Sequence, residues 1–167
     1  MLGTLHFSMN DAAVQKSLTD LAVLLSPVGM TAFLGGQVGP YLARRAGERF
    51  QSEGDDVTGP WAPLKPATVQ IRESQGYPGD HPINRRTGEL EEWVVQGGWD
   101  AYPQGIGATL RFPGKTPQGE LRSKVETAQK GKGYPSTVAR PVLGINERDM
   151  LFVIAALNAN IAQVFGP

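Results

Sequence analysis

The sequence lacks cysteine, contains only two histidines, and has no excess of charge of either sign, with sixteen basic and sixteen acidic residues. Without cysteine, the chain cannot form disulfides, thiolate nucleophiles or cysteine metal sites. A net charge of zero gives no global reason to expect a nucleic-acid or membrane-surface partner. The composition thus excludes several function classes and suggests none.

Few residues could carry chemistry. Asp80 and His81 are adjacent, and a carboxylate can orient an imidazole for metal binding or acid–base catalysis. No third ligand follows at a recognisable spacing, so we interpret the pair as part of a surface loop and keep a small hydrolase as a remote alternative. Neither Gly35-Gly36-x-x-Gly39 nor Gly131-Lys132-Gly133 has the spacing of a phosphate loop. We therefore predict a protein that is not an enzyme, with no catalytic, cofactor-binding or metal-binding residues.

The segment Leu21–Ala43 has no charged residue. Pro27 and Pro40, together with four glycines, interrupt it, which disfavours a transmembrane helix. The N-terminus also lacks the pattern of a signal peptide. We expect buried or subunit-facing helices here and no membrane partner.

Apolar periodicity predicts three main helices. Val14, Leu18, Leu21 and Leu25 form one stripe on a helix over residues 11–26. A second helix is predicted over 28–52, with a kink or break at Gly35-Gly36 and Pro40 and with Gly54 as its C-terminal cap.

The C-terminal helix gives the clearest amphipathic pattern, because apolar residues repeat every three or four positions after Met150. Asn146 is its expected cap, and Asp149 follows three residues later as in a capping box.

Two regions indicate β-structure. Residues 2–9 alternate as a strand does, and residues 94–113 read as a hairpin that turns at Pro103-Gln104-Gly105. The predicted fold is α+β, with one domain over 1–167: a small antiparallel sheet packs with two N-terminal helices and one C-terminal helix.

Two long loops, at about 53–85 and 114–135, complete the predicted organisation. They hold at most short helices, over 68–75 and 121–129, and loops of this length are usually functional or disordered. We expect them to become ordered on assembly and to make most contacts between subunits. Trp61 is predicted to hold the first loop against the domain, and Thr87 to cap a short helix over 89–93.

Basic residues cluster at Arg44, Arg45 and Arg49, but glutamates such as Glu48 are interspersed. A dedicated duplex-reading surface is therefore disfavoured. A DNA-contacting accessory protein that uses these arginines is kept as the alternative function.

One constellation resembles a known family. Gly59, Trp61, Leu64 and Thr68 precede Arg86-Thr87-Gly88-Glu89-Leu90, in the order found in the phage virion morphogenesis, or tail completion, family. Farther on, Arg140-Pro141-Val142-Leu143-Gly144 is similar to the family's Arg-x-Phe-Leu-Gly element. The segment 125–131 departs from the family pattern, because it lacks the usual His and aromatic residue.

The resemblance implies a structural virion protein of the neck or tail end of a tailed phage or prophage, related to tail terminators. Such a protein completes the tail and joins it to the head as a homo-oligomeric ring, expected to be a hexamer. Its implied partners are neck, connector and tail tube proteins, and DNA only as it passes through the channel. Its implied location is the virion, after assembly in the host cytoplasm. The residues implied as structural or interface positions are Trp61, Leu64, Arg86, Thr87, Gly88, Leu90, Arg140 and Leu143.

Overall fold

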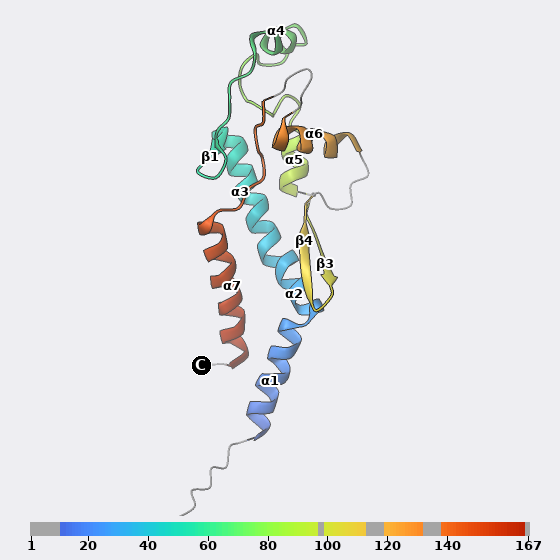
Figure 1. The fold of residues 1–167 in the computed structure, drawn as a ribbon, viewed down its shortest axis with the longest axis vertical. Coiled ribbons are helices and arrows are strands. Elements are labelled where there is room, and N and C mark those ends of the chain that lie inside the picture. Colours follow the sequence, from blue (N-terminus) through green and yellow to red (C-terminus); the bar gives the residue numbers. More distant parts are fainter. Residues whose placement is uncertain (1–10, 97–98, 113–118, 132–137, 166–167) are drawn as a thin grey trace, which may run out of the picture.

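The computed structural model describes residues 11–96, 99–112, 119–131 and 138–165. The predicted strand at 2–9 lies outside these residues. The chain forms an elongated α+β structure in which a helical arm projects from a wider end (Figure 1). The elements, in chain order, are α1 (Asp11–Leu25), α2 (Pro27–Phe33), a π-helix (Leu34–Val38), α3 (Gly39–Ser52), β1 (Gly54–Asp55), β2 (Gly59–Pro60), α4 (Pro66–Ser74), α5 (Glu89–Gln96), β3 (Asp100–Gln104), β4 (Gly107–Arg111), α6 (Gly119–Lys130) and α7 (Glu147–Phe165).

The N-terminal helices follow the predicted boundaries closely. Ser26 separates α1 from α2, and its hydroxyl caps α2 by accepting a hydrogen bond from the Gly29 N–H at 3.1 Å. The predicted irregularity at Gly35-Gly36 is a π-helical segment, in which the Gly39 N–H reaches the Leu34 carbonyl. Pro40 has no N–H to donate to the carbonyl four residues earlier, which gives a physical reason for the widened turn.

The end of α3 differs from the prediction. Glu53, not Gly54, takes the left-handed conformation that terminates the helix, and its N–H donates to the Arg49 carbonyl. Gly54 instead begins β1, with a φ of 120° that a residue with a Cβ adopts poorly. A Cβ there would also collide with the Gly59 backbone across the β1–β2 pair.

The predicted hairpin is shorter than expected. β3 and β4 pair antiparallel with Gln104 opposite Gly107, so the turn comprises Gly105 and Ile106 and not Pro103-Gln104-Gly105. Val94 and Val95 were predicted to be strand but belong to α5. Tertiary packing overrides their β-propensity, because Val94 is fully buried against the core when the segment is helical.

The two predicted loops hold more secondary structure than expected. The first contains the β1–β2 pair and α4, and the second contains α6, which is longer than the predicted helix at 121–129. The helices α4 and α6 correspond to the short helices predicted at 68–75 and 121–129, whereas the β1–β2 pair was not predicted.

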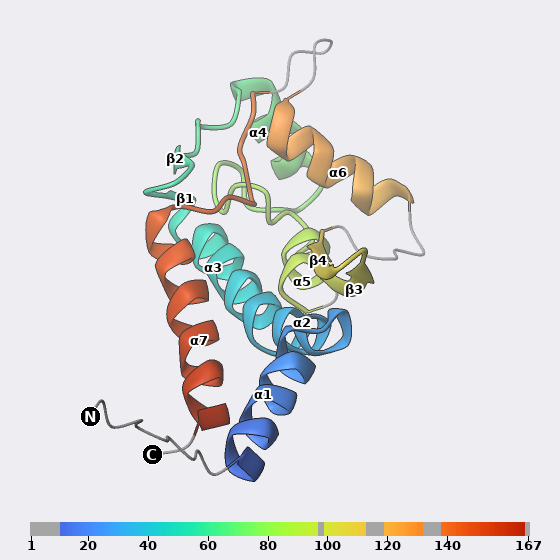
Figure 2. The same cartoon turned by 60° about the horizontal axis from the view of Figure 1, so that its bottom comes forward.

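Two hydrophobic clusters hold the elements together. The cluster at the wide end joins α3, α5, α6 and extended segments through Ala46, Phe50, Trp61, Ile83, Val94, Val125, Ala128 and Val142. The second packs the β3–β4 hairpin and α7 against α2 and α3, around Phe33, Val38, Tyr41 and Leu42. The α7 helix runs beside α3 and ends near α1 (Figure 2). This arrangement agrees with the predicted packing of a small sheet with N-terminal and C-terminal helices.

No described helix has, by itself, the length and hydropathy of a membrane span. The α1 helix and the α2–α3 region reach those values only as a pair, bent by 67°.

Candidate functional site

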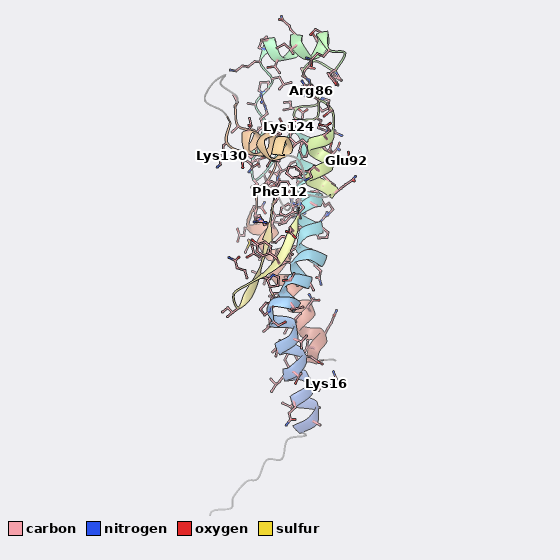
Figure 3. The ribbon with its side chains drawn as sticks, turned by 90° about the vertical axis from the view of Figure 1, so that its right-hand side faces the viewer. Lys16, Arg86, Glu92, Phe112, Lys124 and Lys130 are labelled. Carbon is pink, nitrogen blue, oxygen red and sulfur yellow. The ribbon has the colours of Figure 1, made fainter. Side chains whose placement is uncertain are left out.

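A pocket of about 440 Å³ lies at the wide end of the molecule, between α4, α6 and the turn that leads into α5. Its described lining has four cationic side chains and no carboxylate. The cations are Arg72, Arg86, Lys124 and Arg140, and the larger apolar residues are Leu64, Ile71, Leu90 and Val138. Arg86 and Lys124 lie near each other below α4 (Figure 3).

Six of the eight residues that the resemblance implied as structural or interface positions line this one pocket. They come from three separate parts of the chain: Leu64; Arg86, Thr87, Gly88 and Leu90; and Arg140. The other two, Trp61 and Leu143, lie in or against the neighbouring core. The fold therefore brings together residues that the sequence separates by up to 76 positions, from 64 to 140.

Trp61 is a core residue, buried beneath the pocket wall. Its indole N–H donates to the Pro141 carbonyl at 2.9 Å, and its ring packs edge-on against Phe50, with 5.5 Å between centroids. Its backbone N–H also reaches the Glu53 carbonyl at 2.7 Å. Trp61 thus joins the 53–65 segment to α3 and to the extended segment before α7, in agreement with its predicted role.

Arg140 also holds the 53–65 segment in place, through hydrogen bonds to its backbone. Its guanidinium donates to the Ala62 and Pro63 carbonyls at 2.6 and 2.7 Å, and its backbone N–H donates to the Ala128 carbonyl at 2.7 Å. Burial lowers the pKa of this guanidinium from its usual value. No carboxylate offsets that cost among the described contacts of Arg140, which leaves an uncompensated positive charge beside the pocket.

The segment after Arg140 is extended and has no β-partner among the described strands. The Gln129 side chain takes the place of a strand partner. Its carbonyl oxygen accepts hydrogen bonds from the Val142 and Leu143 N–H groups at 2.7 and 2.9 Å, and its NH₂ group donates to the Leu143 carbonyl at 3.0 Å. This satisfies backbone groups that would otherwise be costly to bury beside Val142. Leu143 is thereby fixed against the core.

Arg72, on α4, was not predicted as a site residue. It is 4% exposed, and one Nη donates to the Pro82 carbonyl at 3.1 Å. Its Nε is buried and has no hydrogen-bond partner among the described groups. Lys124 was also missed; it pairs with Glu89 at 3.4 Å. Because neither residue belongs to a local motif, no sequence signal could have identified them.

The turn into α5 exposes Arg86. Its guanidinium lies over the Tyr77 ring, 5.5 Å from the centroid, and is 3.4 Å from the Gln75 side-chain oxygen. Gly88 has a φ of 81°, and its carbonyl accepts the first α5 hydrogen bond, from the Glu92 N–H. Gly88 therefore holds the cap position that was predicted for Thr87, and the Thr87 side chain is exposed beside the pocket.

The arginine cluster of α3 is not the exposed surface that the DNA-contacting alternative requires. Arg45 and Arg49 are buried. Arg45 Nε donates to Asp149 at 3.0 Å, and Arg49 Nε donates to Asp55 at 2.5 Å. Only Arg44 remains exposed, and it pairs with Glu48. Asp55 is mostly buried in this ionic cluster.

Asp149 is the centre of the cluster. Burial alone raises the pKa of its carboxyl, but hydrogen bonds from the Tyr41 hydroxyl, the Asn146 N–H and Arg45 outweigh burial and lower it below the usual value. The Tyr41 pKa is raised, first by burial and then by this contact. Asp149 and Asn146 also exchange the two hydrogen bonds of the predicted capping box.

His81 has a partner other than the one the sequence suggested. Its Nδ1 is 2.7 Å from a Glu53 carboxylate oxygen, whereas Asp80 only accepts a hydrogen bond from the His81 backbone N–H. The hydrogen bond to Glu53 raises the pKa of the imidazole. Within the described residues, no three His, Asp or Glu side chains are grouped closely enough to hold a metal ion. The described residues around Asp80 and His81 therefore form no metal site.

A second surface feature lies on α7. Its inner face packs Val153, Ala156 and Leu157 against the core around Tyr41. Its solvent-facing side exposes apolar residues as well: Met150, Leu151, Ile154 and Phe165 are each about half exposed, beside the exposed polar residues Asn158 and Gln163. No charged residue occurs from 150 to 165.

Comparisons with protein-family models, curated proteins and solved structures found no match to this chain, so its resemblance to the tail completion family rests on the quoted residues alone.

Proposed function

We propose that this protein is a structural virion component of the neck or tail end of a tailed phage or prophage. In this role it forms a homo-oligomeric ring, expected to be a hexamer, that completes or terminates the tail and joins it to the head. Its partners are further copies of itself and the adjoining neck, connector and tail tube proteins. The ring surrounds the DNA channel.

The outer face of α7 is the observation that supports this proposal. A helix on the surface of a monomer normally places charged and polar side chains toward solvent and its apolar side chains toward the core. The α7 helix carries no charge over the sixteen residues 150–165, and its outer face exposes apolar side chains beside the polar Asn158 and Gln163. A second protein surface over the outer face would complete its burial.

The free energy available from burying this patch favours an assembly with several interfaces over a single pair of subunits. Burying one such side chain fully contributes about 1.5–3 kcal/mol, and these four are already half buried, so their burial contributes roughly 3–6 kcal/mol. Association costs about 4–15 kcal/mol in rigid-body freedom alone. A closed ring gives every subunit two heterologous interfaces, which makes such a modest patch more effective than it is in a single pair.

The test is the mass of the protein in solution, measured by light scattering with and without purified tails. We expect a closed ring, or a monomer that assembles into a ring on tail ends. The double variant Leu151→Glu/Ile154→Glu should prevent assembly while preserving the fold, because both side chains point outward. Ile106→Glu is the matched control: Ile106 is 98% exposed at the hairpin turn, on a different element.

Three results would contradict the proposal. The first is a wild-type monomer that ignores tails at all concentrations. The second is loss of assembly in the Ile106→Glu control to the same extent as in the double variant. The third is a monomer that binds lipid vesicles through α7, which would show that the apolar face contacts a membrane.

A further inference from the structure

We propose that the pocket between α4, α6 and the turn into α5 binds an acidic segment of a partner protein, in which one carboxylate side chain is flanked by apolar side chains. The site is separate from the outer face of α7, which lies on the helical arm (Figure 1). The inference therefore stands whether or not the protein forms a ring.

Charge complementarity is the first argument. Four cationic side chains line the pocket, and no Asp or Glu is among its described lining residues. Guanidinium groups bind carboxylates through pairs of charge-assisted hydrogen bonds, which are about twice as strong as neutral ones. Lys124 is paired with Glu89, so the three arginines are the cations that give this lining its preference for anionic ligands.

The buried arginine Arg72 is the second argument. Nearly all buried polar groups have hydrogen-bond partners, and an unpaired one costs about 1–3 kcal/mol. The Arg72 Nε has none within the described structure, although the residue lines the pocket. Arg140 is 7% exposed, and within the part of the chain that the structure describes its guanidinium bonds to carbonyl oxygens alone. A ligand carboxylate in the pocket would lie beside these two arginines, which both line it, and would offset their positive charge.

The apolar walls define the rest of the ligand. Leu64, Ile71, Leu90 and Val138 line the same cavity, and Ile71 and Val138 are each about half exposed. A volume near 440 Å³ is within the range of about 300–1,000 Å³ that is typical of ligand sites. A strongly hydrated dianion such as phosphate would lose water against these walls, whereas a carboxylate between branched side chains matches both parts of the lining. This comparison favours a peptide over a phosphate ligand.

The test uses two pools of blocked tripeptides: acetyl-X-Glu-X-amide and acetyl-X-Gln-X-amide, where X is Leu, Ile, Val or Phe. Phenyl phosphate is the third probe. Binding to the full chain is measured by calorimetry and by the rise in melting temperature, because a ligand that binds only the native state stabilises it. We expect the Glu pool to bind at least about tenfold more tightly than the Gln pool.

Variants locate the binding. Arg86→Gln removes an exposed pocket cation without disturbing the core and should weaken Glu-pool binding by about tenfold. Arg111→Gln is the matched control, because Arg111 is also exposed and also lies over a tyrosine ring, that of Tyr102 at 5.2 Å, but outside the pocket. Arg72→Met should weaken binding further, with its fold checked by circular dichroism.

Equal binding of the two pools, no binding of either, or equal effects of Arg86→Gln and Arg111→Gln would each overturn the inference. Binding of phenyl phosphate without binding of the Glu pool would also overturn it and would identify the site as one for phosphate-bearing ligands.

Discussion

Replacing the buried Asp149 by Asn should destabilise the protein far more than removing a single charge from its surface. Asp149 is fully buried and lies 3.0 Å from Arg45 Nε and 2.7 Å from the Tyr41 hydroxyl. Both contacts are made by Oδ1, which asparagine retains. The other oxygen, Oδ2, accepts from the Asn146 N–H at 3.1 Å and faces Arg49 at 3.9 Å. In the variant an NH₂ group would face these two donors.

Breaking a buried ion pair by removing one partner typically costs about 3–5 kcal/mol, because the remaining charge stays buried. The lower end applies here, since Arg45 keeps its contacts with Glu48 and Asp56, and Arg49 keeps Asp55. We therefore expect a loss of about 3 kcal/mol in the free energy of unfolding. For a chain of this size that corresponds to a fall of about 6–12 °C in melting temperature.

The assay is urea and thermal unfolding at one fixed protein concentration, so that assembly contributes equally to each variant. Asp56→Asn is the control within the same cluster: its side chain is 63% exposed, and exposed pairs contribute at most about 1 kcal/mol. If Asp149→Asn were no more destabilising than Asp56→Asn, the ionic cluster would not stabilise the junction of α3 and α7, and the reasoning would be refuted.

Two further predictions concern the burial of Trp61 and the response of the ionic cluster to acid. Trp61→Ala should cost about 3–5 kcal/mol in urea unfolding, because a buried ring and its hydrogen bond to Pro141 are both lost, and an unchanged midpoint would show that the 53–65 segment is held by other contacts. Acid should weaken the fold: native contacts lower the Asp149 and Asp55 pKa values below the ordinary 3.8, so their stabilisation is complete above that pH and is lost as pH falls through the lower native pKa values. The urea midpoint should therefore drop below about pH 4 in the wild type and drop less in Asp149→Asn, and equal slopes in the two proteins would contradict this assignment.

Local patterns in the sequence determined most of the helical framework. The stripe from Val14 to Leu25 and the Asn146–Asp149 capping box both depend on neighbours within one or two turns, so their geometry is encoded locally. The same holds for the irregularity near Gly35-Gly36, where Pro40 removes a backbone donor. These features were predicted with nearly correct boundaries.

Features that depend on contacts between residues far apart in the sequence were decided only by the tertiary structure. Val94 and Val95 have side chains that favour strands, but they are helical because the helix buries Val94 in the core. Arg45 and Arg49 read as a surface cluster until Asp149, about a hundred residues away, is placed against them. The pocket is the strongest case: Leu64, Arg86 and Arg140 were each singled out from the sequence, but Arg72 and Lys124 join them only through the packing of α4 and α6. A charge-lined cavity is a property of several segments at once, and no local pattern encodes it.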